Sequence, residues 1–91
     1  MSNNKIALSS LSMDLKRVAL GYWWGSDKMA ERFLEEAIRR REEIDKSSLE
    51  GYLVKLLDRL DDIKKENDLK KAAEESLMFS TLFQNAACKI F

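Results

Sequence analysis

Apolar residues recur at helical spacing along most of the chain, with polar residues between them. In the first stretch, steps of three and four separate Leu8, Leu11, Leu15, Val18 and Tyr22. Such steps place side chains on one face of a helix. The same spacing predicts helices over residues 9–22, 27–46, 48–66 and 69–90, and no strand.

Short polar segments separate these helices and carry signals for their ends. Gly25 is expected to end the first helix in a left-handed conformation. Ser47 and Glu50 have the Ser-x-x-Glu spacing of a capping box, which predicts the start of the third helix. Asn67 or Asp68 is expected to cap the fourth. Because connections this short hold consecutive helices antiparallel, the sequence predicts an all-α fold, a small antiparallel (up-down) four-helix bundle. The alternative is a bundle of three helices with the first helix folded across them.

The composition indicates one domain and excludes several kinds of chemistry. A chain of 91 residues has the size of a single domain, so residues 1–91 are expected to form one helical-bundle domain. The absence of histidine removes His-based acid–base catalysis and His-containing metal sites. A single cysteine, Cys88, allows no disulfide within the chain, and we expect it to be a small core residue. No catalytic, cofactor-binding or metal-binding constellation is predicted.

The charge balance and the apolar stretches bear on partners and location. The chain has 16 basic and 16 acidic side chains, whereas nucleic-acid-binding domains carry an excess of basic residues. No signal-peptide pattern is visible. The most apolar stretch, 77–91, is interrupted by polar residues and falls short of the roughly 20 apolar residues that a membrane span needs. We therefore expect a cytoplasmic protein with no nucleic-acid partner and no membrane partner.

Three consecutive aromatic residues, Tyr22, Trp23 and Trp24, lie at the predicted corner between the first two helices. Tryptophan and tyrosine are frequent anchors of protein interfaces, so all three are candidate interaction residues. The other interpretation is structural, with one ring closing the end of the bundle and another lying over it. The sequence favours neither interpretation over the other.

Arg41 is a further candidate, because its helical angle places it between Ala37 and Ile44 in the apolar arc of helix 27–46. A charge in that position needs a partner. Asp45 on the next turn or an acidic residue of a second chain would supply one; otherwise the aliphatic stem carries the charge out to solvent. Arg41 is therefore a candidate interface residue, although the solvent-directed conformation is the favoured interpretation.

Helix 69–90 is more apolar than packing on one side requires. Its apolar arc covers roughly 220° of the circumference, against a little over 100° for a helix packed on one side of a bundle. Met78 lies beyond this arc, and Leu82 lies at its edge. A two-fold contact would bury both side chains, so the sequence predicts that dimerisation through the second half of this helix completes the bundle. The alternative is that the helix is the central helix of a monomer.

These observations favour a small non-enzymatic helical-bundle protein that acts through self-association, as a homodimer, and through binding of another protein. The alternative is a metal-dependent (Mg or Mn) hydrolase whose acidic residues assemble across a helical dimer, since paired carboxylates recur along the chain. Those carboxylates face away from the apolar stripes and therefore toward solvent, as ordinary surface charges do. A third and weaker interpretation is a nucleic-acid-associated regulator that uses the arginines at 39–41.

Overall fold

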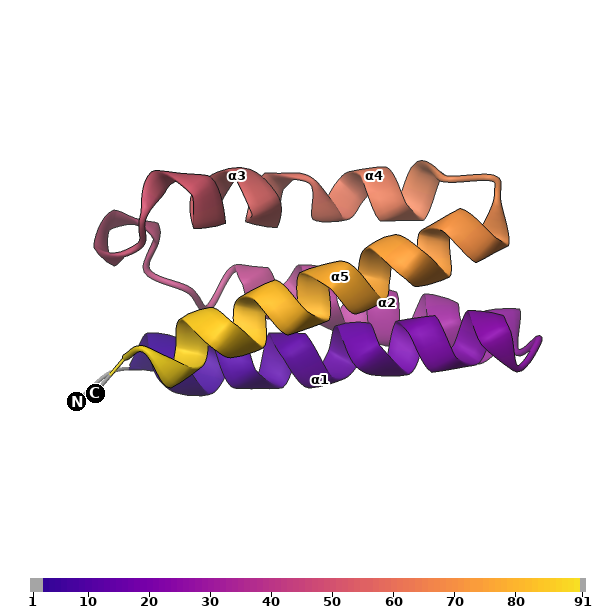
Figure 1. Cartoon of the computed structure of the whole chain (residues 1–91), viewed down its shortest axis with the longest axis horizontal. Coiled ribbons are helices and arrows are strands. Elements are labelled where there is room, and N and C mark those ends of the chain that lie inside the picture. The colour runs from indigo at the N-terminus through magenta and orange to yellow at the C-terminus, as the bar shows by residue number, and fades with distance from the viewer. Residues whose placement is uncertain (1–2, 91) are drawn as a thin grey trace.

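The computed structural model describes residues 3–90, and all of their regular structure is helical (Figure 1). In chain order the elements are α1 (Asn3–Trp23), α2 (Asp27–Arg41), a 3₁₀ turn (Lys46–Ser48), α3 (Gly51–Asp58), α4 (Leu60–Lys65) and α5 (Leu69–Cys88). Residues 3–90 contain no strand, so the predicted all-α class is confirmed. Within this range no helix is both long enough and apolar enough to span a membrane.

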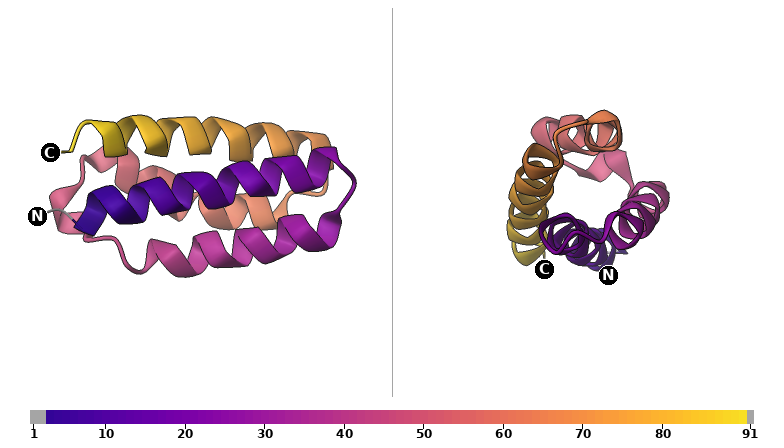
Figure 2. Two further views of the ribbon diagram at one scale, coloured as in Figure 1. Left: turned by 90° about the horizontal axis from the view of Figure 1, so that it is seen from below. Right: turned by 90° about the vertical axis from the view of Figure 1, so that its right-hand side faces the viewer.

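Seen along the long axis of the molecule, the helices surround one core in the order α1, α2, α3–α4 and α5 (Figure 2). α3 and α4 follow one another with Arg59 between them, and together they occupy the position of the predicted third helix. α1 packs most closely against α5 and α2. At one end, the Lys5 ammonium donates hydrogen bonds to the carbonyl oxygens of Ala87 (3.2 Å) and Ile90 (2.9 Å), which joins the beginning of α1 to the end of α5.

Large apolar side chains fill the centre of the bundle. The largest fully buried ones are Leu8, Leu11, Leu15, Val18, Leu57, Leu60, Ile63, Phe79 and Phe83. The rings of Phe79 and Phe83 meet edge to face, with centroids 6.3 Å apart. The positions predicted as the seam of the first helix are therefore buried, except that Tyr22, at the end of the seam, is only partly buried.

Small residues allow α1 to approach both neighbouring helices closely. Ser12 and Ser80 are buried where α1 meets α5, and each hydroxyl donates a hydrogen bond of 2.7 Å to the carbonyl oxygen of the other residue. Gly21 faces Ala30 of α2, and a Cβ at position 21 would lie 2.8 Å from the amide nitrogen of Ala30. Real Cβ atoms essentially never come this close to another heavy atom, so any larger residue requires α2 to shift.

Two predicted helix ends are confirmed. Gly25 has φ +75°, in the left-handed region, and follows the last turn of α1. Asp68 caps α5, because its carboxylate accepts hydrogen bonds from the backbone N–H groups of Lys70 (3.1 Å) and Lys71 (3.3 Å). Both signals are local, which is why the sequence alone is sufficient to identify them.

Two helices differ in length from the prediction. α1 begins at Asn3 rather than at residue 9, because buried Asn4 exchanges two side-chain hydrogen bonds with the backbone of Asp45 (2.9 and 3.0 Å). α2 ends at Arg41 rather than at residue 46, and the turn that follows places Ile44 in the core. Long-range contacts therefore extend one helix and shorten the other.

The predicted capping box is wrong. The Asp45 carboxylate accepts hydrogen bonds from the Ser47 N–H (3.1 Å), the Ser47 hydroxyl (2.6 Å) and the Ser48 hydroxyl (3.0 Å). The side chain of Glu50, the residue before α3, makes no capping bond. Because Asp45 takes both serine hydroxyls, the chain forms a 3₁₀ turn here, and α3 begins only at Gly51.

Candidate protein-interaction site

The corner between α1 and α2 separates the three consecutive aromatic residues. The Ser26 N–H donates to the Gly21 carbonyl (2.8 Å) and the Gly25 N–H to the Tyr22 carbonyl (3.2 Å), the bonding pattern of a Schellman motif. With the chain ended in this way, Tyr22 packs against the core, whereas Trp23 is 48% exposed and Trp24, the next residue, is 71% exposed. The two indole rings are therefore the most accessible large aromatic groups at this end of the molecule.

Trp23 lies beside α5. With Glu74, Leu77, Met78, Thr81 and Leu82 it lines an open hollow of about 390 Å³. Met78 is 46% exposed, and Leu82 is partly buried against the core. The structure thus brings together Trp23, Met78 and Leu82, which were predicted separately from the sequence as interaction residues. Trp24 and Tyr22 do not line this hollow.

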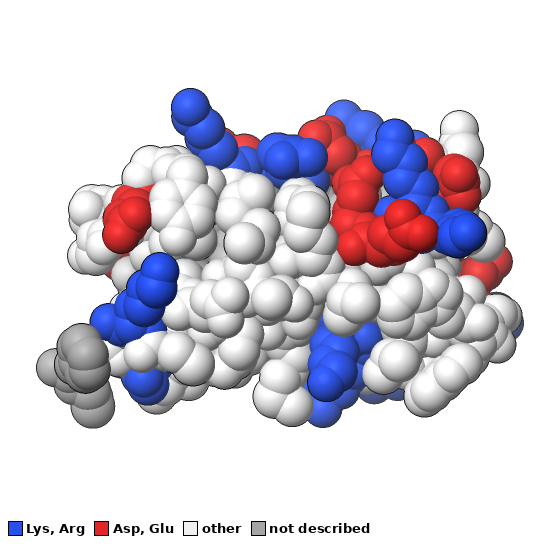
Figure 3. All heavy atoms as spheres, viewed as in Figure 1, with Lys and Arg blue, Asp and Glu red and all other residues white. Residues whose placement is uncertain are grey.

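The outward side of α5 is a continuous exposed stripe. Lys70 and Lys71 are exposed one turn before this stripe. From Glu74 onward its exposed residues are Glu74, Met78, Thr81, Asn85, Cys88 and Lys89. Half-buried Leu77 and Leu82 border it, and we call these eight residues the α5 face. In the view with α5 foremost, a broad area of uncharged side chains crosses the middle of the molecule (Figure 3).

Packing within the chain covers the inward side of α5 but not its outward side. Phe79, Phe83, Ala86 and Ala87 are buried, so the neighbouring helices cover much of the wide apolar arc. The helix is therefore not central, because one side of it is open to solvent. Cys88 lies on that open side, and the expectation that it is a core residue was wrong. The reason is its helical angle, which aligns it with the exposed stripe rather than with Phe79 and Phe83.

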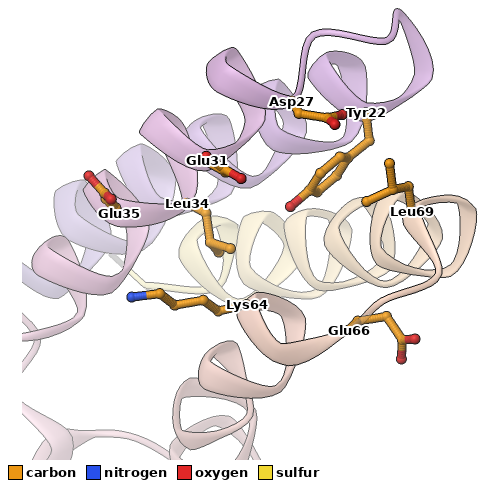
Figure 4. Close-up of a pocket in the computed structure, with 8 residues that line it drawn as sticks. All are labelled: Tyr22, Asp27, Glu31, Leu34, Glu35, Lys64, Glu66 and Leu69. Atoms are coloured by element: carbon orange, nitrogen blue, oxygen red, sulfur yellow. The ribbon is translucent and has the colours of Figure 1, made fainter.

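A second depression lies beside Tyr22, between α2, α4 and the start of α5 (Figure 4). It has a volume of about 290 Å³ and is lined by Tyr22, Asp27, Glu31, Leu34, Glu35, Lys64, Glu66 and Leu69. We call it the acidic cleft. Asp27, Glu31 and Glu35 are spaced four residues apart, which puts all three on one side of α2.

The electrostatic field of the acidic cleft acts on Tyr22, whose hydroxyl is directed into it (Figure 4). Burial is the main cause that raises the pKa of Tyr22 above its ordinary value, and the negative charges of Glu31 and Asp27 raise it further. Across the cleft, Glu66 has a partner of its own, since the Lys71 ammonium lies 3.7 Å from its carboxylate. The cleft therefore presents mainly negative charge around an aromatic ring.

The carboxylates of the acidic cleft do not converge on one point. Successive members of the α2 row are four residues apart, a rise of about 6 Å, so all three cannot contact one small ion. Within residues 3–90, no group of three or more His, Cys, Asp or Glu side chains is arranged so that it could hold a metal ion. What the cleft offers is a negatively charged surface with apolar walls.

Arg41 has its partner within the chain. Its guanidinium donates hydrogen bonds to the Leu57 carbonyl (3.1 Å) and to the Asp61 carboxylate (3.1 Å), and its side chain is only 13% exposed. The expected partners were Asp45 or an acidic residue of a second chain, but Asp45 binds the serines of the 3₁₀ turn instead. Asp61 belongs to α4, so the residue spacing within helix 27–46 could not identify it as the partner of Arg41.

The other two arginines of the 39–41 segment also have acidic partners. Arg39 lies 2.7 Å from Glu36, and Arg40 lies 3.1 Å from Asp14. Asp14 is buried in α1, although sequence reasoning did not single it out. The available signal was an acidic residue between Met13 and Leu15, inside an apolar stretch. These ion pairs neutralise the arginine charges that would otherwise bind the phosphates of a nucleic acid.

No family model, no curated protein and no solved structure matches this chain.

Proposed function

We propose that this protein is a non-enzymatic, antiparallel (up-down) four-helix bundle that acts by self-association and by binding another protein. The α5 face and the adjacent Trp23 form the contact surface. The single supporting observation is that Trp23, Met78 and Leu82 line one hollow while Trp23 and Met78 remain about half exposed. The single thiol, which allows no disulfide within the chain, favours a cytoplasmic location.

The side of the molecule that carries the α5 face is large enough for a homodimer. Between its Cα extremes the molecule measures 38 Å by 19 Å in the view that has α5 foremost. A standard interface takes about 800 Å² from each partner, which is close to the area of this side of the molecule. Burying the exposed part of Met78 and Trp23 contributes about 25 cal/mol for each Å² of apolar surface removed from water.

Sedimentation equilibrium at micromolar concentration tests the proposal. The wild-type chain is expected to have about twice the mass of its 10.6 kDa protomer. Met78→Glu and Leu82→Glu place a charge in the contact and shift the species to monomer. Ile6→Glu is the matched control, since Ile6 is 65% exposed but lies beside Arg40 and Glu43, away from α5, and this variant remains a dimer.

Two further outcomes decide between the proposal and its alternatives. Trp23→Ala weakens dimerisation, whereas Trp24→Ala, which changes a ring outside the hollow, does not. Millimolar Mg²⁺ or Mn²⁺ leaves the melting temperature unchanged, because a metal that bound the folded state would raise it. A wild-type chain that stays monomeric at high concentration would overturn the self-association.

A further inference from the structure

The α5 face carries one acidic side chain near the start of the helix and one basic side chain at its end. Glu74 and Lys89 are both exposed. Neither forms an ion pair with any residue in the range 3–90. The exposed residues of the α5 face between them, Met78, Thr81, Asn85 and Cys88, are uncharged. The face is therefore complementary to a surface with the same charges in the reverse order.

A second copy of α5 in antiparallel orientation presents that reverse order. When a two-fold axis passes between Thr81 and Leu82, Glu74 of each copy lies level with Lys89 of the other. The same axis places Met78 level with Asn85 of the second copy and one turn from its Leu82. Apolar groups then meet at the centre, and opposite charges meet at both ends.

Two other alignments of the α5 helices bring like charges together. A parallel pair would set Glu74 beside Glu74 and Lys89 beside Lys89, and would also align the two helix dipoles. An antiparallel pair with its axis at Ser80 would set Lys71 level with Lys89 of the second copy. Charge therefore disfavours these two alignments, whereas the axis between Thr81 and Leu82 sets Glu74 level with Lys89.

We propose that the partner of the α5 face is a second copy of this chain, docked antiparallel on a two-fold axis between Thr81 and Leu82, with Glu74 of each copy paired to Lys89 of the other. This geometry rests on the proposed self-association and adds its orientation and register. Trp23, beside Glu74, then lies near the end of the second copy's α5.

Charge reversal at the two ends tests the register. Glu74→Lys and Lys89→Glu each put like charges at both ends of the contact, so each single variant weakens the dimer about tenfold at low salt. The double variant Glu74→Lys/Lys89→Glu restores opposite charges and returns the dissociation constant to near the wild-type value. High salt reduces the differences, because exposed charges are screened. Asp62→Lys, an exposed charge reversal on α4, leaves the dimer unchanged.

Cross-linking tests the orientation without changing any charge. In this geometry Cys88 of one copy lies about 20 Å along the helix axis from Cys88 of the other, so a short bismaleimide leaves the wild-type dimer unlinked. A cysteine beside the axis, in Thr81→Cys/Cys88→Ser, is linked efficiently. Linking through Cys88 itself would show a parallel pair and overturn the proposal.

The outcomes separate this inference from the function on which it rests. If the wild-type chain is monomeric, both fail. If Met78→Glu dissociates a wild-type dimer but the double charge reversal does not restore what the single variants lose, the self-association holds and the register is wrong. Circular dichroism of each variant checks that the bundle remains folded.

Discussion

Replacing Gly21 by alanine is expected to destabilise the protein, although alanine is the better helix former. Alanine gains about 1 kcal/mol over glycine in a helix interior. At this position its Cβ would lie 2.8 Å from the amide nitrogen and 3.0 Å from the Cα of Ala30, and these backbone atoms cannot rotate away. Overpacking of this kind costs about 1–3 kcal/mol. The clash outweighs the gain, so we expect a net loss of up to about 2 kcal/mol in the free energy of unfolding.

Gly51→Ala is the matched control, with the opposite sign. Gly51 is exposed at the first residue of α3, and a Cβ there has no neighbour within 4 Å. We expect this variant to be more stable by about 0.5 kcal/mol, because alanine restricts the unfolded chain and favours the helix. The two substitutions make the same chemical change, so only their surroundings differ.

Urea unfolding followed by circular dichroism measures both effects. The protein concentration is held fixed, since the stability of an associating chain depends on it. The unfolding midpoint of Gly21→Ala falls below that of the wild type and the midpoint of Gly51→Ala rises above it, with equal m-values. A Gly21→Ala variant as stable as Gly51→Ala would show that α1 and α2 are not held so close together that a Cβ at position 21 meets the backbone of Ala30.

Two further predictions concern Arg41 and Tyr22. Arg41→Met lowers the free energy of unfolding by about 1–2 kcal/mol in the same assay, because it removes hydrogen bonds of a nearly buried guanidinium. Asp61→Asn, at a half-exposed carboxylate, costs less than about 1 kcal/mol. Tyr22 holds its proton more tightly in the folded state, so stability falls as the pH rises past 10.0, and Glu31→Gln lowers the Tyr22 pKa in a tyrosinate absorbance titration.

The helices could be predicted from the sequence wherever their signals are local. The apolar repeat of the first helix, the glycine that ends it and the aspartate that caps the last helix each act within a few residues. The errors occur where distant residues decide. Asn4 extends α1 by hydrogen bonding to Asp45, and Ile44 enters the core and shortens α2. No periodicity within a single helix contains this information.

In the candidate site, too, the sequence revealed the local features but not those that depend on long-range contacts. The sequence identified Trp23, Met78 and Leu82 one by one, since an aromatic corner and an over-wide apolar arc are both visible locally. Their shared hollow depends on α1 packing beside α5. That packing depends in turn on Ser12 and Ser80, small polar residues that a hydrophobic pattern assigns to solvent although they are buried.

The contact between Ser12 of α1 and Ser80 of α5 has a consequence for the order of folding. Ser12 and Ser80 are separated by 68 positions in the chain, so α1 meets its closest neighbour only after nearly the whole sequence has been synthesised. At about 5–20 residues per second, this interval is on the order of ten seconds. During that time α1 can pair only with α2, and the side of its seam that belongs against α5 stays exposed on the ribosome. The nascent hairpin is then the species most open to aggregation and to capture by a chaperone.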